Sequence, residues 1–258
     1  MRARNHTLAL LVLLLSLGAA VANGQPSTKW PQHSMDRPVP PVVDPGAGAL
    51  PVPPPADAVV LFGGTSLDQW QSDDGSAAKW IVRDGYVEVA PGTGGIRTRA
   101  GFGDVQLHVE WATPSPGEGE GQDRGNSGVF LMGMYEVQVL DSYQNRTYAD
   151  GQAGAVYGQF PPLVNASRPP GVWQSYDIVF HRPRFDAKGG LVRPARMTVL
   201  HNGVLVLDNV TLSGPTANKQ RPPYKAHANQ LPLSLQDHSH KVRYRNIWVR
   251  ALSEAGSS

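Results

Sequence analysis

The sequence of 258 residues predicts an all-β fold built as a sandwich of two antiparallel sheets. Three observations support this prediction. Roughly a dozen short apolar segments are separated by turn residues, which is typical of sandwiches and jelly rolls. No window shows a sustained helical period of hydrophobic residues. Glycine (28) and proline (23) are frequent, and together they favour turns and strands over long helices.

Each expected strand rests on its own local pattern. The segment 104–111, DVQLHVEW, alternates strictly, so that one face is apolar and the other is polar. Two segments, 79–90 and 195–209, are hairpins by pattern, because Asp-Gly and Asn-Gly pairs stand at their turns. The remaining strands are expected, in order, at 58–62, 127–132, 135–141, 173–181, 231–238 and 241–252.

The two ends of the chain differ in composition from the middle. Residues 1–22 have a basic start, an apolar run and an A-x-A site, which predicts a secretory signal peptide and export to the periplasm or beyond. The apolar run is shorter than the ~20 residues that a membrane span needs. Residues 23–56 are rich in proline and are expected to form a linker or disordered tail; a segment that wraps back over the domain is the alternative. The folded domain is expected at 57–253, with a flexible tail at 254–258.

Charge and cysteine content exclude several classes of function. The formal net charge is +2, which is too small to indicate a nucleic-acid-binding protein. There are no cysteines, so disulfides, thiolate catalysis, cysteine metal sites and a lipoprotein anchor are excluded. We therefore expect neither a nucleic-acid partner nor a membrane anchor, and the sequence does not indicate an oligomeric state.

The strand YEVQVLDS, which begins at Tyr135, is interrupted by polar residues. Alternation places Glu136 and Gln138 on one face and the intervening valines on the other. Asp141 is out of phase by one residue, and a β-bulge near Leu140 would bring it to the polar face. We expect Glu136 and Asp141 to be catalytic and Gln138 to bind substrate. The structural alternative is that both acids are satisfied by backbone groups or arginine.

A second polar group closes the expected strand 231–238, in the order Gln236-Asp237-His238. Histidine titrates near neutral pH and also binds metals, so His238 is a candidate base or metal ligand. It could equally be a loop histidine that is bonded to the backbone. Further candidates for substrate binding are an amide before a strand, an aromatic ring on which a sugar could stack, and polar residues of other strands: Asn126, Tyr157, Gln236, Glu110 and Arg245.

Several pieces of the sequence, read in order, resemble the bacterial 3-keto-disaccharide hydrolase family. They are LFGGTSLDQW, VEW, NSGVFLMGMYEVQVLDS, GAVYG and LQDHSHKVRYRNIWVR, spread over residues 59–252. The resemblance implies a concanavalin-like jelly roll of the lectin and glucanase type. It also implies an oxidised saccharide or glycoside as substrate, with a ketone at C3.

A ketone at C3 acidifies the hydrogen on C2, so a base can start elimination of the group on C1, and water can then add. Such chemistry needs a base and an electrophile for the enolate oxygen. We expect His238 to be the base. A divalent metal ion could be the electrophile, held by Glu136 and His238.

Two other classes of function stay open. The E-x-Q-x-x-D spacing resembles the E-x-D-x-x-E strand of concanavalin-fold endoglucanases, which would make the protein a retaining glycosidase with Glu136 and Asp141 ~5 Å apart. The neutral Gln138 departs from that pattern, because the endoglucanases carry an acid at this place. A non-catalytic carbohydrate-binding module is the other possibility. It would hold a sugar on the same face without cleaving it.

Overall fold

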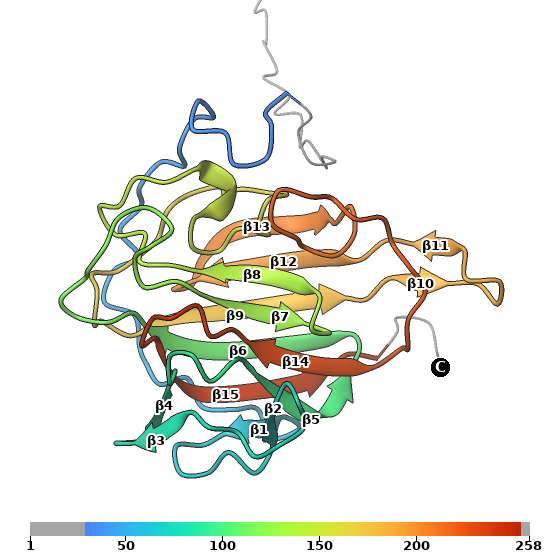
Figure 1. Cartoon of the computed structure of the whole chain (residues 1–258), viewed down its shortest axis with the longest axis horizontal. Helices are drawn as coiled ribbons and strands as arrows, with labels where there is room; N and C mark the ends of the chain where they lie inside the picture. Colours follow the sequence, from blue (N-terminus) through green and yellow to red (C-terminus); the bar gives the residue numbers. More distant parts are fainter. Residues whose placement is uncertain (1–28, 254–258) are drawn as a thin grey trace, which may run out of the picture.

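The computed structural model describes residues 29–253, which form two antiparallel β-sheets packed face to face (Figure 1). The larger sheet has eight strands in the order β13-β12-β9-β6-β15-β4-β3, and β1 also pairs with β15. The smaller sheet has five strands in the order β2-β5-β14-β7-β8. Strands β10 and β11 form a separate two-stranded ribbon. The predicted two-sheet antiparallel sandwich is confirmed.

The strands are β1 Val59–Phe62, β2 Trp70–Ser72, β3 Ile81–Arg83, β4 Tyr86–Glu88, β5 Ile96–Phe102, β6 Val105–Ala112, β7 Ser127–Leu131, β8 Tyr135–Val139, β9 Gln174–His181, β10 Arg184–Phe185, β11 Leu191–Arg193, β12 Arg196–His201, β13 Val204–Thr211, β14 Leu231–Leu235 and β15 Arg243–Ala251. One 3₁₀ turn, η1 (Ala149–Gly151), lies in the loop after β8.

Within residues 29–253, no helix has the length and apolar character needed to cross a membrane. The signal peptide predicted at 1–22 and the tail predicted at 254–258 lie outside the described residues, and export stays a prediction.

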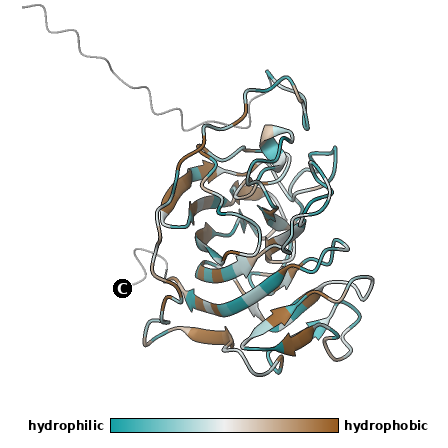
Figure 2. Ribbon diagram, turned by 90° about the vertical axis from the view of Figure 1, so that its left-hand side faces the viewer, coloured by the Kyte–Doolittle hydropathy of each residue, from teal (hydrophilic) through white to brown (hydrophobic). Residues whose placement is uncertain are grey.

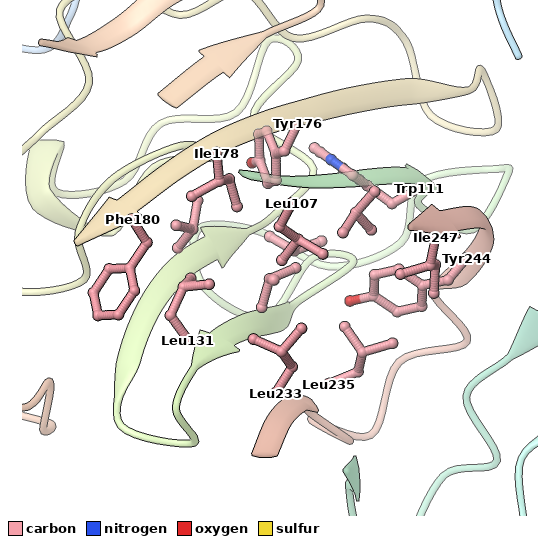
Figure 3. Packing of buried hydrophobic residues seen from close by; sticks show 14 of the residues in the cluster. Leu107, Trp111, Leu131, Tyr176, Ile178, Phe180, Leu233, Leu235, Tyr244 and Ile247 are labelled. Atoms are coloured by element: carbon pink, nitrogen blue, oxygen red, sulfur yellow. The ribbon is translucent and has the colours of Figure 1, made fainter. Parts of the chain in front are cut away.

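The hydrophobic core lies between the two sheets. The apolar face predicted for β6 is buried there, with Val105, Leu107, Val109 and Trp111 all in the core cluster. Figure 3 shows how side chains from both sheets meet, with Ile178 of β9 on one side and, on the other, residues of β7 and β14 that include Leu131, Leu233 and Leu235. Burial of these apolar faces fixes which face of each strand is left for other contacts.

The proline-rich segment before β1 is packed against the domain, which corrects the linker or tail expected at 23–56 over the part described, 29–56. Asn165 N donates to Pro41 O at 2.8 Å, and Val43 N donates to Asn165 O at 3.0 Å. Figures 1 and 2 show this segment running along one side of the sandwich towards β1. We call residues 29–56 the N-terminal strap. Proline has no backbone N–H to donate, so the N–H groups of the other residues and the carbonyl oxygens carry the attachment.

The far end of the strap is held by polar groups of the larger sheet. Val52 N donates to Glu110 Oε1 at 2.9 Å, and Asn246 Nδ2 donates to Val52 O at 2.7 Å. A chain that begins at residue 53 should therefore unfold at a temperature roughly 5–10 °C lower than one that begins at residue 29, because it lacks these bonds. Calorimetry on the two chains measures the difference, and equal unfolding temperatures would contradict the role of the strap.

Candidate active site

A pocket of about 290 Å³ lies on the outer face of the five-stranded sheet, the face turned away from the core. In β8, Tyr135, Val137 and Val139 belong to the hydrophobic core. Because side chains alternate along a strand, Glu136 and Gln138 point to the opposite face, where both line the pocket. The alternation expected for this strand is confirmed.

The other walls of the pocket come from segments far apart in the sequence. The loop after β8 folds back along the edge of that strand, since Val156 forms a bridge with Val137. A second loop is fixed where Thr216 Oγ1 accepts a hydrogen bond from Glu136 N at 3.2 Å. The remaining lining residues are Asn126, Phe130, Tyr157, Ala217, Asn218, Gln236 and His238. The fold thus brings Glu136 and His238 to one pocket.

The Glu136 carboxyl is buried, and the residue is only 6% exposed. It forms no side-chain hydrogen bond or ion pair with any residue in the described part of the chain. Desolvation by burial disfavours the charged form, and it raises the pKa of Glu136 to about 8. At pH 7 the carboxyl is therefore mostly protonated, and it can donate a hydrogen bond to an oxygen in the pocket.

His238 lies in the turn that follows β14, and its side chain is exposed. Hydrogen bonds of its neighbours to other strands and loops fix this turn. Gln236 N donates to Gly128 O at 3.0 Å, and Asp237 Oδ2 accepts from Gly94 N at 3.1 Å. The imidazole itself forms no hydrogen bond within residues 29–253. It is therefore available to exchange a proton with a ligand.

A network of amides supports the floor of the pocket. Gln138 Nε2 donates to Asn126 Oδ1 at 3.0 Å, and Asn126 Nδ2 donates to Gln122 O at 2.8 Å. These bonds fix the orientation of both amides. The predicted candidates Gln138, Asn126 and Gln236 all line the pocket. Their amides can exchange hydrogen bonds with sugar hydroxyls.

Tyr157 lines the pocket and is linked to residues that the sequence did not suggest. Its hydroxyl lies 2.8 Å from that of Tyr148, and burial raises the pKa of both phenols. The ring of His33, in the N-terminal strap, stacks on Tyr148 with centroids 4.1 Å apart. Asp150 accepts hydrogen bonds from His33 N at 3.2 Å. No local pattern marks these residues, because the path of the strap and the folding of the loop after β8 bring them together.

Asp141 does not line this pocket. Its Oδ2 accepts a hydrogen bond from Arg124 Nε at 2.8 Å, so it fits the arginine-paired alternative considered for it. Burial raises the pKa of Asp141, although the adjacent Arg124 favours the charged form. The prediction of a β-bulge near Leu140 is wrong. Strand β8 ends at Val139, and its register with β7 is unbroken.

Glu110 and Arg245 are not brought to the pocket either. They lie on neighbouring strands of the larger sheet, where Arg245 Nε donates to Glu110 Oε2 at 2.7 Å. Burial acts to raise the pKa of Glu110, but hydrogen bonds from His108, Asn246 and Arg245 outweigh it and lower the pKa to about 2. The structure thus places both residues away from this pocket, since alternation alone does not tell which sheet a polar face belongs to.

A divalent ion was expected at Glu136 and His238. In the part of the chain that the structure describes, no group of three or more His, Cys, Asp or Glu could hold a metal ion. The pocket offers one carboxyl and one imidazole, with amide oxygens as further donors. The observation that fits a cation is the buried carboxyl of Glu136, which has no positively charged partner within residues 29–253. The metal site stays a prediction.

Comparison with known proteins identifies the family. The model of the 3-keto-alpha-glucoside-1,2-lyase-like domain matches residues 57–250, which is most of the chain. No curated protein matches.

Solved structures agree with this assignment. A candidate glycosyl hydrolase from Parabacteroides distasonis ATCC 8503 is 45% identical with a TM-score of 0.74, over 84% of this chain and 93% of that one. A second candidate glycosyl hydrolase from the same organism is 18% identical with a TM-score of 0.56, over 76% of this chain and 94% of that one, and it shows the fold alone. The chain therefore belongs to the family of 3-keto-alpha-glucoside-1,2-lyase-like domains.

Proposed function

We propose that this protein cleaves 3-keto-glycosides by elimination followed by hydration. The observation that carries the proposal is the pairing of two different groups in one pocket. His238 is an exposed imidazole that forms no hydrogen bond within the described residues, and Glu136 is a buried carboxyl that is mostly neutral at pH 7. The first can accept a proton, and the second can donate a hydrogen bond to an oxygen that becomes negative.

The first step is removal of the proton on C2. The ketone at C3 makes this proton acidic, because the resulting charge is delocalised onto the C3 oxygen. His238 takes the proton, and Glu136 stabilises the enolate oxygen by a hydrogen bond from its neutral carboxyl. A donor held in a buried site is already oriented, so it stabilises the charge without reorganisation.

The second step breaks the bond between C1 and the glycosidic oxygen. The electron pair of the enolate forms the C1–C2 double bond, and the leaving group departs as an alcohol with the proton that His238 carries. Water then adds to the resulting enone at C1, and a proton returns to C2. The net reaction is hydrolysis, and it proceeds without an oxocarbenium ion.

The remaining pocket residues suit recognition of the sugar. Gln138 Oε1 forms no hydrogen bond within residues 29–253, so it is an open acceptor for a sugar hydroxyl. Tyr157 supplies an aromatic face and a hydroxyl fixed by Tyr148. A divalent ion is the alternative electrophile. Glu136, His238 and the amide oxygen of Gln138 would hold it, and it would supply polarisation of the carbonyl.

One assay tests the proposal with paired substrates, a glucoside and its 3-keto form, each with and without a chelator. Release of the alcohol from the keto form alone supports elimination. Release from both forms supports the retaining glycosidase, which the separation of Glu136 from Asp141 does not favour. Release from neither supports a binding module. Loss of release in the chelator identifies a metal ion as the electrophile.

A further inference from the structure

The first part of the N-terminal strap lies against two loops that form walls of the pocket (Figure 1). Gln32 Nε2 donates a hydrogen bond to Ala217 O at 3.1 Å, and Ala217, in the loop between β13 and β14, lines the pocket. The same side chain covers the backbone of Gly158, where an added Cβ atom would overlap with it. Gly158 directly follows Tyr157, another lining residue. Gln32 therefore bridges the two loops.

The next residue of the strap, His33, contacts the loop after β8 through both its backbone and its ring. Its N–H donates to both carboxylate oxygens of Asp150, each at 3.2 Å. Its ring stacks on Tyr148 with an interplanar angle of 15°, and its centroid lies 5.0 Å from that of Tyr157. The backbone of His33 has a φ of 64°, a left-handed conformation that few residues other than glycine adopt. Such a conformation persists where the surrounding contacts hold it.

These contacts limit how Tyr157 can move. Its hydroxyl lies 2.8 Å from that of Tyr148, and His33 covers one face of the Tyr148 ring. Tyr148 can keep this hydrogen bond only while its own ring is fixed. Neither Gln32 nor His33 lines the pocket in the described part of the chain. An effect of the strap on the reaction would therefore pass through residues of the pocket wall.

We propose that Gln32 and His33 are positioning residues, which hold Tyr157 and the loop 216–218 in the geometry that binds the sugar. The inference rests on the proposed function, because that function makes this pocket the place of reaction. Without the stacked ring, Tyr157 can reorient. The loss should then appear in binding of the sugar, and therefore in KM, rather than in proton transfer to His238.

Point variants of the full chain test the proposal. His33→Ala removes the stacked ring, and His33→Phe keeps an aromatic ring in its place. Met35→Ala is the matched control, because Met35 belongs to the same strap and is 49% exposed. Each variant is assayed for release of methanol from methyl 3-keto-glucoside. We expect His33→Ala to raise KM by about fivefold to tenfold with little change in kcat, His33→Phe to restore most of the wild-type KM, and Met35→Ala to change neither value.

A double-mutant cycle with Tyr157→Ala distinguishes positioning from a general loss of stability. If His33 acts through Tyr157, His33→Ala should raise KM no further in a chain that already carries Tyr157→Ala. Two independent effects would instead multiply. Multiplied effects, or a wild-type KM in His33→Ala, overturn the proposal.

Amide hydrogen exchange tests the same proposal without substrate. If the wild type cleaves no 3-keto-glycoside, the proposed function fails, and the role of the strap is judged from the exchange rates alone. His33→Ala should speed exchange in residues 148–158 and Gln32→Ala in residues 216–218, each by roughly tenfold, because local opening becomes easier. Met35→Ala should leave both segments unchanged. Wild-type exchange rates in the first two variants would contradict the assignment.

Discussion

Replacing His238 by alanine should abolish turnover of a 3-keto-glucoside while the fold stays intact. A positioned base contributes roughly 10²–10⁴-fold to a proton transfer, so kcat should fall by that factor. The fold should not change, because His238 is exposed and forms no hydrogen bond within residues 29–253. Initial rates with the keto substrate and an unfolding curve measure the two quantities on the same preparation.

His181→Ala is the matched control for this prediction. His181 is also exposed, but it ends β9 in the larger sheet, close to Asp104, and does not line the pocket. Its loss should leave turnover unchanged. Added imidazole should restore part of the activity of His238→Ala, since a small base can enter the space that the side chain vacates. Undiminished turnover in His238→Ala would remove this residue from the mechanism.

The sequence predicted the parts of the site that depend on local pattern. Alternation along β8 was sufficient to place Glu136 and Gln138 on the face opposite the core, because two buried valines fix the phase of the strand. The strand β5, with sequence IRTRAGF, was not predicted. Its arginines and glycine interrupt the alternation of apolar and polar residues that marks a strand. It nevertheless pairs with β2 and β14 inside the smaller sheet. Tertiary pairing outweighs strand propensity there.

The expected site residues that lie elsewhere share one physical cause, which is that a strand pattern fixes a face but not its partner across space. Glu110 alternates correctly on β6, but the polar face of that strand meets Arg245 and the strap. A β-bulge was expected to bring Asp141 to the site, whereas the structure pairs its carboxylate with Arg124 of the loop before β7. No sequence pattern indicated that His33 would lie near the site, because a proline-rich segment predicts mobility unless the folded domain supplies contacts for it.

The largest effect of a single group after His238 is expected at Glu136. If its neutral carboxyl donates to the enolate oxygen, Glu136→Ala should lower kcat by about 10²–10³-fold, as loss of an oxyanion donor does. Glu136→Gln should retain much of the activity, because a carboxamide can also donate. If the glutamate acts in its ionised form, the glutamine variant should instead be as inactive as the alanine variant.

The dependence on pH separates these two cases. The pKa of Glu136 is raised to about 8 by burial, so the donor form is present below pH 8 and is lost as the pH rises through 8. The kcat of the wild type should therefore fall above pH 8, while that of Glu136→Gln should not fall there. A wild-type kcat that instead rises through pH 8 would contradict the proposed role.

The same shift has a consequence for stability that can be measured without substrate. The folded state binds the Glu136 proton more tightly than the unfolded state, whose pKa is near 4.5. The stabilisation from this group is therefore full below pH 4.5 and is lost as the pH rises towards 8. Glu136→Gln, which carries no charge at any pH, should match the wild type near pH 4 and exceed its free energy of unfolding at pH 8. Chemical denaturation at the two pH values gives both differences. A carboxyl that is buried without a partner among residues 29–253 lowers stability at high pH, and a need for its neutral form in the reaction would explain why the chain carries it.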